Sequence, residues 1–129
     1  MAEPPLATIR VNGIDLVAGK TTYSEARRKR KLAQLGAVDP LAILELAKVA
    51  GFGAEKHGRY TYAEGYDWSK CYDALQRHLN QWWAGEDNDA ESGLSHLTHA
   101  AWRCLALLSF VLRERGTDDR LHRVLEELE

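Results

Sequence analysis

Apolar side chains recur at helical spacing through most of the chain after Asp39, and this pattern constrains the fold more than any other feature. Asp39 and Pro40 indicate where the first helix begins, because aspartate caps free N–H groups and proline suits the first helical turn. Gly58 marks the predicted end of this helix. A second helix is predicted to start near Asp67 and to stop at Gly85. The pattern therefore predicts an all-α protein.

A third helix is predicted to follow an acidic turn, with Asp87 or Asp89 as its N-cap and its end near Arg115 and Gly116. The tail, residues 117–129, has the apolar spacing of a short amphipathic helix. We therefore expect a small bundle of three to four main helices.

The apolar positions also predict which face of each helix is buried. On the first helix they are Leu44, Ala47, Ala50, Gly51 and Ala54. On the second helix they are Trp68, Cys71, Tyr72, Leu75, Leu79 and Trp82, with His78 in the middle of the same face. On the third helix they are Leu94, Leu97, Ala101, Leu105, Leu108 and Leu112. One histidine is thus predicted to point into the bundle.

The first residues predict a β-hairpin that embellishes the helical body. Two short apolar runs flank an Asn-Gly pair at residues 12–13, which favours a tight type I′ turn. In that register Arg10 faces Asp15 across the hairpin. Because 129 residues suit one domain, we divide the chain into a hairpin arm, residues 1–22, and a single helical domain, residues 23–129.

Charge and composition exclude several classes of protein. Seventeen Lys and Arg residues oppose nineteen Asp and Glu residues, so the net charge of −2 argues against binding nucleic acid through overall charge. A basic run at residues 27–31 is either a solvated surface or a cationic arm for a polyphosphate, and nucleic-acid binding ranks third. The most apolar stretch, residues 100–112, is shorter than the roughly 20 residues of a membrane span. With no signal peptide predicted, we expect a cytoplasmic protein without a membrane partner.

The candidate catalytic and metal-binding residues are concentrated in the stretch at residues 82–99. Four carboxylates lie within six residues, and they are Glu86, Asp87, Asp89 and Glu91. Hard oxygen ligands of this kind suit Mg²⁺ or Mn²⁺, and such ions bind phosphate oxygens. His96 and His99 follow on one helix face, where two imidazoles can complete a site, transfer protons or hydrogen-bond to phosphate.

A purely structural interpretation stays open for the same residues. Carboxylates ahead of a helix interact favourably with its positive N-terminal end, so part of the acidic turn can serve only as caps. Histidines inside a helical bundle are often hydrogen-bonded core groups. Composition and spacing by themselves lead to a helical domain with a metal or phosphate site as its candidate function.

A resemblance to a known family adds to this interpretation. The segments GAEKHGRYTY (53–62), Trp68 and YDALQRHLNQWWAGEDNDAESGLSHLTHAAW (72–102) resemble the N-terminal domain of the small phage-type dATP/dGTP diphosphohydrolases. The similarity runs from about Lys31 to Leu112. A more distant kinship with the all-helical MazG-like pyrophosphohydrolases is also suggested, although their EExxE…ExxD carboxylate pattern is missing here.

The resemblance implies hydrolysis of dGTP or dATP to the monophosphate and pyrophosphate, in control of the nucleotide pool. Mg²⁺, Mn²⁺ or another divalent ion is expected on the four carboxylates of the acidic turn. The residues expected to orient or deprotonate water are Glu55, His96 and His99, with His78 reaching toward them. The residues expected to bind substrate are Lys56, Arg59, Tyr60, Trp68, Arg77 and Arg103.

Two alternatives remain beside the enzyme. One is a non-catalytic helical phage protein that binds a nucleotide or a protein partner, and the other is nucleic-acid binding through residues 27–31. For the enzyme we expect a purine deoxynucleoside triphosphate as substrate, the host cytoplasm as location, and a homo-oligomer, either a dimer or larger.

Overall fold

The computed structural model describes residues 8–11, 14–17 and 33–129. Contacts within the chain divide it into two units, residues 1–39 and residues 40–129, and each is described by itself. Three predicted features lie outside the described residues: the turn at 12–13, the domain boundary at 22–23 and the basic run at 27–31.

The described residues of the first unit form one pair of strands and one short helix. Strands β1 (Thr8–Val11) and β2 (Ile14–Val17) pair in antiparallel fashion, with Arg10 opposite Asp15. A short 3-10 helix, η1 (Leu35–Ala37), precedes the second unit.

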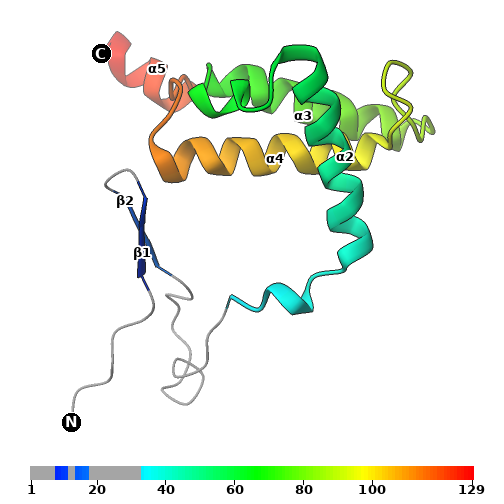
Figure 1. Ribbon diagram of the computed structural model, residues 1–129. Coiled ribbons are helices and arrows are strands. Elements are labelled where there is room, and N and C mark those ends of the chain that lie inside the picture. Colours follow the sequence, from blue (N-terminus) through cyan, green and yellow to red (C-terminus); the bar gives the residue numbers. More distant parts are fainter. Residues whose placement is uncertain (1–7, 12–13, 18–32) are drawn as a thin grey trace, which may run out of the picture. The chain divides into compact units, whose positions relative to one another are not determined.

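The second unit is helical, which confirms the all-α prediction for residues 40–129. Its elements are α2 (Pro40–His57), the 3-10 helix η2 (Thr61–Glu64), α3 (Trp68–Trp83), α4 (His96–Arg113) and α5 (Leu121–Leu128). Helices α3 and α4 lie side by side, and α2 packs against α4 (Figure 1). The predicted stops at Gly58 and Gly85 are confirmed, since both glycines have a positive φ that ends the helix before them.

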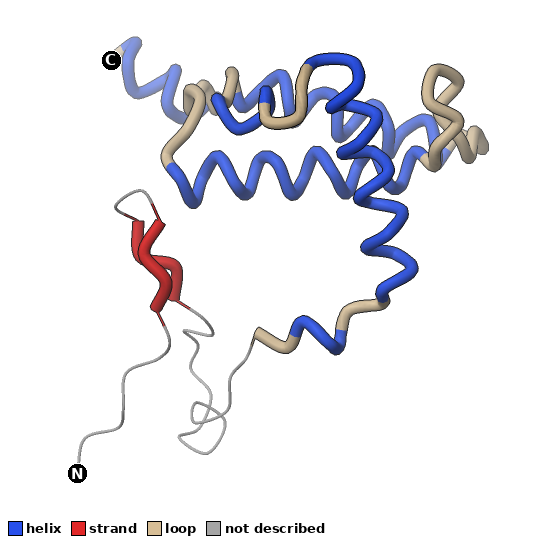
Figure 2. The backbone as a smooth tube through the Cα atoms, viewed as in Figure 1, coloured by secondary structure: helices blue, strands red, loops and turns tan. Residues whose placement is uncertain are grey.

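The start of α4 differs from the prediction. Neither Asp87 nor Asp89 is its N-cap; the helix begins at His96, and the side chain of Ser95 accepts a hydrogen bond from the N–H of Leu97. Residues 84–95 form the loop between α3 and α4, which Figure 2 draws in tan. The carboxylate of Asp89 is engaged inside this loop instead, so it does not cap the helix.

The predicted buried face of α4 is wrong. The leucines expected inside lie at the surface, and Leu108 is 55% exposed. The opposite side of the helix is buried, with Ala106 and Phe110 each only 1% exposed, and His96 and His99 lie on it. Small alanines on that side let α3 come close, which leaves the leucine side without a neighbour among the described residues.

The predicted face of α2 is also wrong in part. Val49 is its buried residue, whereas Leu44 and Ala47 are exposed. The exposed apolar residues Leu41, Ile43 and Leu44 all lie in the N-terminal half of the helix, and Val49 is further along. Burial is therefore confined to the later turns of α2, which reach the cluster described below.

The hydrophobic core lies between the first half of α3 and the second half of α4. It consists of Cys71, Ala106 and Phe110, with Tyr66 and Trp68 packed against it. The ring of Tyr66 meets Phe110 edge to face, with centroids 5.2 Å apart.

The loops that enter α3 and leave α4 touch at two glycines. The amide of Trp68 donates to the carbonyl of Thr117, and Gly65 and Gly116 both have a positive φ. A Cβ at Gly65 would collide with the backbone nitrogen of Gly116, so this crossing requires glycine. No helix of the described residues combines the length and the apolarity that a bilayer crossing needs.

Candidate functional site

Three histidines from two helices meet at the end of the α3–α4 pair that carries the loop. His78 lies on α3, and its Nδ1 is 2.8 Å from the Nδ1 of His96 on α4. His99, one turn further along α4, stacks on the ring of His78 with centroids 4.6 Å apart and planes 11° from parallel. The i, i+3 spacing on α4 and the inward face of α3 thus bring together the three imidazoles that the sequence singled out.

His96 is the most deeply buried member of the group. Its side chain is 0% exposed, and its Nε2 has no hydrogen-bond partner among the described residues. A carboxylate oxygen, Oε1 of Glu86, lies 3.5 Å from that nitrogen. A carboxylate facing Nε2 favours a proton on that nitrogen, which leaves the lone pair of Nδ1 directed toward His78.

Asp89 and Ser92 join the loop to the same group. The N–H of Ser92 donates to Oδ2 of Asp89 at 2.9 Å, and Oγ of Ser92 lies 2.6 Å from Nε2 of His99. That Nε2 is also 3.8 Å from Oδ2 of Asp89. These contacts fix a carboxylate beside the imidazoles.

The environment of His78, His99 and Asp89 favours neutral imidazoles and an ionised carboxylate, which are the forms that bind a cation. Burial, together with the neighbouring His99 and His96, lowers the pKa of His78 from 6.5 to about 4. Burial likewise lowers the pKa of His99. Partial burial raises the pKa of Asp89, but hydrogen bonds from Ser92 outweigh this and hold it below 3.8. Near neutral pH, His78 and His99 are therefore neutral imidazoles beside a charged carboxylate.

One atom from each of His78, Asp89 and His96 can serve as a metal ligand, and these atoms lie within 4.8 Å of one another. Asp89 is thus the member of the predicted carboxylate set that falls in this group. Glu86 stands behind His96, and Glu91 pairs with Lys56, Oε1 to Nζ, at 2.5 Å.

The histidine group opens into a cavity of about 120 Å³. His78, Asp89 and His99 contribute to its wall, and Lys56 and Arg103 add two cationic side chains. Two of the predicted substrate-binding residues therefore lie in the same cavity as the imidazoles.

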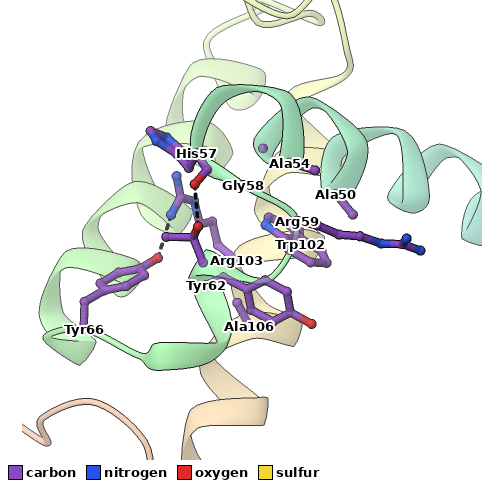
Figure 3. Close-up of a pocket in the computed structure, with 12 residues that line it drawn as sticks. Ala50, Ala54, His57, Gly58, Arg59, Tyr62, Tyr66, Trp102, Arg103 and Ala106 are labelled. Atoms are coloured by element: carbon purple, nitrogen blue, oxygen red, sulfur yellow. Dashed lines mark hydrogen bonds between the residues drawn. The ribbon is translucent and has the colours of Figure 1, made fainter.

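A second cavity, of about 200 Å³, adjoins the first and has an aromatic lining (Figure 3). The two cavities share four lining residues: Gly53, His57, Trp102 and Arg103. Tyr62 meets Trp102 edge to face at 5.0 Å between centroids. On the other side, Nη1 of Arg103 donates to the hydroxyl of Tyr66 at 2.7 Å, and a dashed line joins these two labelled residues in Figure 3.

Burial raises the pKa of Tyr66, and a hydrogen bond with Cys71 raises it further, against the opposing effect of Arg103. The phenol therefore stays protonated near neutral pH. Its oxygen holds Arg103 where both cavities meet, with the guanidinium group still lining each of them.

Trp68 and Tyr60, two other predicted site residues, lie outside these two cavities. Trp68 packs on the core and donates its indole N–H to the carbonyl of Arg115 at 2.9 Å. It precedes His78 by ten residues, which is about 15 Å along a helix. Arg59 lines the aromatic cavity, and its guanidinium lies 5.5 Å from the ring of Tyr60, which lines neither cavity.

Three further predicted residues, Glu55, Arg77 and Asp87, have exposed positions and line neither cavity. The backbone carbonyl of Asp87 accepts a hydrogen bond from the N–H of His96, so its observed contact is structural.

Sequence reasoning missed the aromatic side chains Tyr62, Tyr66 and Trp102 of the second cavity. A signal for Trp102 was present, because it follows His99 by three residues and so lies on nearly the same side of α4. Tyr62 and Tyr66 come from the connection before α3, whose path the spacing of residues does not define.

Comparison with known proteins places the chain in a family. A family model described as dATP/dGTP diphosphohydrolase, N-terminal, matches residues 22–120. A dATP/dGTP diphosphohydrolase of Salmonella phage PMBT28 is 34% identical over 87 residues. That alignment covers 67% of this chain and 29% of the phage protein, so the chain spans less than a third of that relative. No solved structure matches. The chain belongs to the family of N-terminal domains of dATP/dGTP diphosphohydrolases.

Proposed function

We propose that this chain hydrolyses purine deoxynucleoside triphosphates to the monophosphate and pyrophosphate, with a divalent cation bound beside Asp89. The observation that carries the proposal is the joining of two cavities. One contains imidazoles, two carboxylates and two cationic side chains, and the other is lined by aromatic residues. The name of the phage relative supports a nucleotide substrate.

The triphosphate fits the smaller cavity by charge. Lys56 and Arg103 reach it from different helices, α2 and α4, and can bind phosphate oxygens from two directions. Lys56 forms a salt bridge with the exposed Glu91. Because surface pairs of this kind contribute little to stability, replacing Glu91 with a phosphate oxygen as the partner of Lys56 costs little free energy.

The purine fits the larger cavity by shape and polarity. Trp102 and Tyr62 present aromatic surface on which a base can stack, and the Tyr66 hydroxyl offers a polar contact near Arg103. Because Arg103 and Trp102 line both cavities, a nucleotide that spans the two would place its α-phosphate near the histidines.

The reaction is an in-line displacement. A water oxygen attacks the α-phosphorus, the bond from that phosphorus to the bridging oxygen breaks, and pyrophosphate leaves with the bonding electrons. A neutral imidazole lining the cavity, His99, accepts the proton that the water loses. A divalent cation held beside Asp89 would neutralise charge on the phosphates and make the water more acidic. Lys56 and Arg103 hold the leaving pyrophosphate.

The test is release of pyrophosphate from dGTP and dATP by the purified chain in the presence of Mn²⁺. We expect release by the wild type and loss by at least about a hundredfold in Asp89→Asn, since the ionised carboxylate is removed. Asp73→Asn, on the exposed side of α3, is the matched control and should keep the wild-type rate. Thermal stabilisation by dGTP without turnover would contradict hydrolysis and favour a nucleotide-binding protein.

Three finer expectations stay predictions: a role in control of the nucleotide pool, a cytoplasmic location and self-association. For self-association, the exposed leucines of α4 provide apolar surface among the described residues, and Leu105 and Leu108 lie near its middle.

A further inference from the structure

We infer that His78, Asp89 and His96 bind a divalent first-row transition metal ion in preference to Mg²⁺, with Glu86 positioning His96 from behind. The inference deepens the proposed function and depends on it only for the role of the metal in hydrolysis. The arguments are the spacing of the ligand atoms, the unpartnered nitrogen of His96 and the chemistry of the donor set.

The spacing of the two imidazoles suits one shared ion. Nδ1 of His78 and Nδ1 of His96 are 2.8 Å apart and share a hydrogen bond, which a bound ion would replace. Two nitrogens each about 2.1 Å from a metal and at right angles to one another are about 3.0 Å apart. Asp89 places a carboxylate oxygen within 4.8 Å of a ring nitrogen of each histidine.

The buried nitrogen of His96 shows which of its atoms faces the ion. Nε2 is fully buried without a hydrogen bond and lies 3.5 Å from Oε1 of Glu86. A histidine that ligates a metal commonly directs its other N–H to a carboxylate, which fixes the tautomer and the ring. In this arrangement Nδ1 of His96 is the ligand, and Glu86 acts through His96.

The loop holds the third ligand in the same way. The N–H of Ser92 donates to Oδ2 of Asp89, and the Ser92 hydroxyl bonds to His99, which stacks on His78. Ser92 therefore links the carboxylate to the imidazole layer. A site whose ligands are each held from outside is organised before the ion arrives.

Two imidazoles and one carboxylate define the class of ion. Mg²⁺ prefers oxygen ligands and near-ideal octahedral geometry, whereas imidazole nitrogen suits Fe²⁺, Co²⁺ and Zn²⁺. The group offers two nitrogens from His78 and His96 and one carboxylate from Asp89. The ligand set therefore selects a transition metal.

Titration of the metal-free full chain with Co²⁺ alone tests the inference, with visible absorption and calorimetry as readouts. We expect one Co²⁺ per chain, affinity at least about tenfold lower in His78→Ala, and unchanged affinity in His122→Ala on exposed α5. Asp89→Asn provides a second variant, and far-UV circular dichroism checks that both fold. Equal Co²⁺ affinity in wild type, His78→Ala and Asp89→Asn would overturn the inference, as would displacement of Co²⁺ by an equal concentration of Mg²⁺.

Glu86→Gln tests the positioning role. We expect about 10- to 100-fold weaker Co²⁺ binding at unchanged stoichiometry and unchanged stability of the metal-free chain, whereas Glu126→Gln should match the wild type. Unaltered Co²⁺ affinity in Glu86→Gln would overturn that role.

These measurements separate the inference from the proposed function. Tight Co²⁺ binding that His78 and Asp89 control supports the metal site, even in a chain that releases no pyrophosphate. Hydrolysis of dGTP with Mg²⁺ that persists in His78→Ala would overturn the metal site and leave the proposed function standing.

Discussion

Protonation of His78 is expected to destabilise the metal-free chain in a defined pH window. Burial, together with His99 and His96, lowers the pKa of His78 from 6.5 to about 4, and Arg103 acts in the same direction against Asp89. In the unfolded chain this ring titrates near its ordinary pKa of about 6.5. The unfolded state thus binds more protons than the folded state between these values, so stability is lost as pH falls from about 6.5 to about 4.

The magnitude follows from the same pKa values. A pKa that falls from 6.5 to about 4 corresponds to about 3 kcal/mol for a ring shielded from solvent. Solvent reaches part of the His78 ring and screens its interactions, so we expect a loss of about 1–2 kcal/mol from this group. His99 acts in the same direction because its pKa is also lowered by burial. Asp89 contributes only below its ordinary pKa of 3.8, outside the window.

Urea unfolding followed by circular dichroism, with a chelator present, measures this loss at about pH 7.5 and about pH 4.5. The free energy of unfolding differs between the two pH values, and this difference should be about 1–2 kcal/mol smaller in His78→Gln than in the wild type. In His122→Gln it should equal the wild-type value. Equal stability of the wild type at both pH values would refute the reasoning. If His78→Gln loses as much stability at low pH as the wild type, groups other than His78 cause the loss.

The remaining predictions concern the core, a backbone crossing and the phosphate contact. Phe110→Ala should lower the free energy of unfolding by about 3–5 kcal/mol, and Leu108→Ala by less than about 1 kcal/mol, as urea unfolding will show; the reverse order would contradict the observed face of α4. Gly65→Ala should lower the thermal midpoint by several degrees, because its Cβ would collide with Gly116; an unchanged midpoint in calorimetry would contradict this crossing. Lys56→Ala should raise KM for dGTP about tenfold in steady-state assays of pyrophosphate release, and an unchanged KM would remove Lys56 from the phosphate site.

The ends of the first two helices could be predicted because their signals are local. Pro40 starts α2, while Gly58 and Gly85 stop α2 and α3 through a positive φ that few other residues adopt. The start of α4 could not be predicted in this way. Asp89 offers a capping side chain, but its carboxylate is taken by Ser92 inside the loop.

The buried face of α4 could not be predicted because the helix is apolar on nearly every side. Leucines mark one side and small residues with Phe110 mark the other, so hydrophobic spacing does not choose between them. The choice depends on how closely α3 can approach. Ala100 and Ala106 allow a close approach, and the histidines lie on the side that they define.

Several residues of the site could be predicted from the sequence, but their arrangement in space could not. His96, His99 and Asp89 are close in sequence, and His78 was expected to reach them from another helix. Which carboxylate lies near which histidine depends on the path of the loop. That path places Asp89 among the imidazoles and Glu86 next to Nε2 of His96. The aromatic cavity could not be predicted without knowing how the connection before α3 folds.

The most direct measurement is mass spectrometry of the products formed from dGTP in water enriched in ¹⁸O. Attack of water on the α-phosphorus places one ¹⁸O in dGMP and leaves pyrophosphate unlabelled. We predict this pattern for the wild type with Mn²⁺ and no product from Asp89→Asn. Label in the pyrophosphate, formation of dGDP with inorganic phosphate, or equal product from Asp89→Asn would contradict hydrolysis at the site described here.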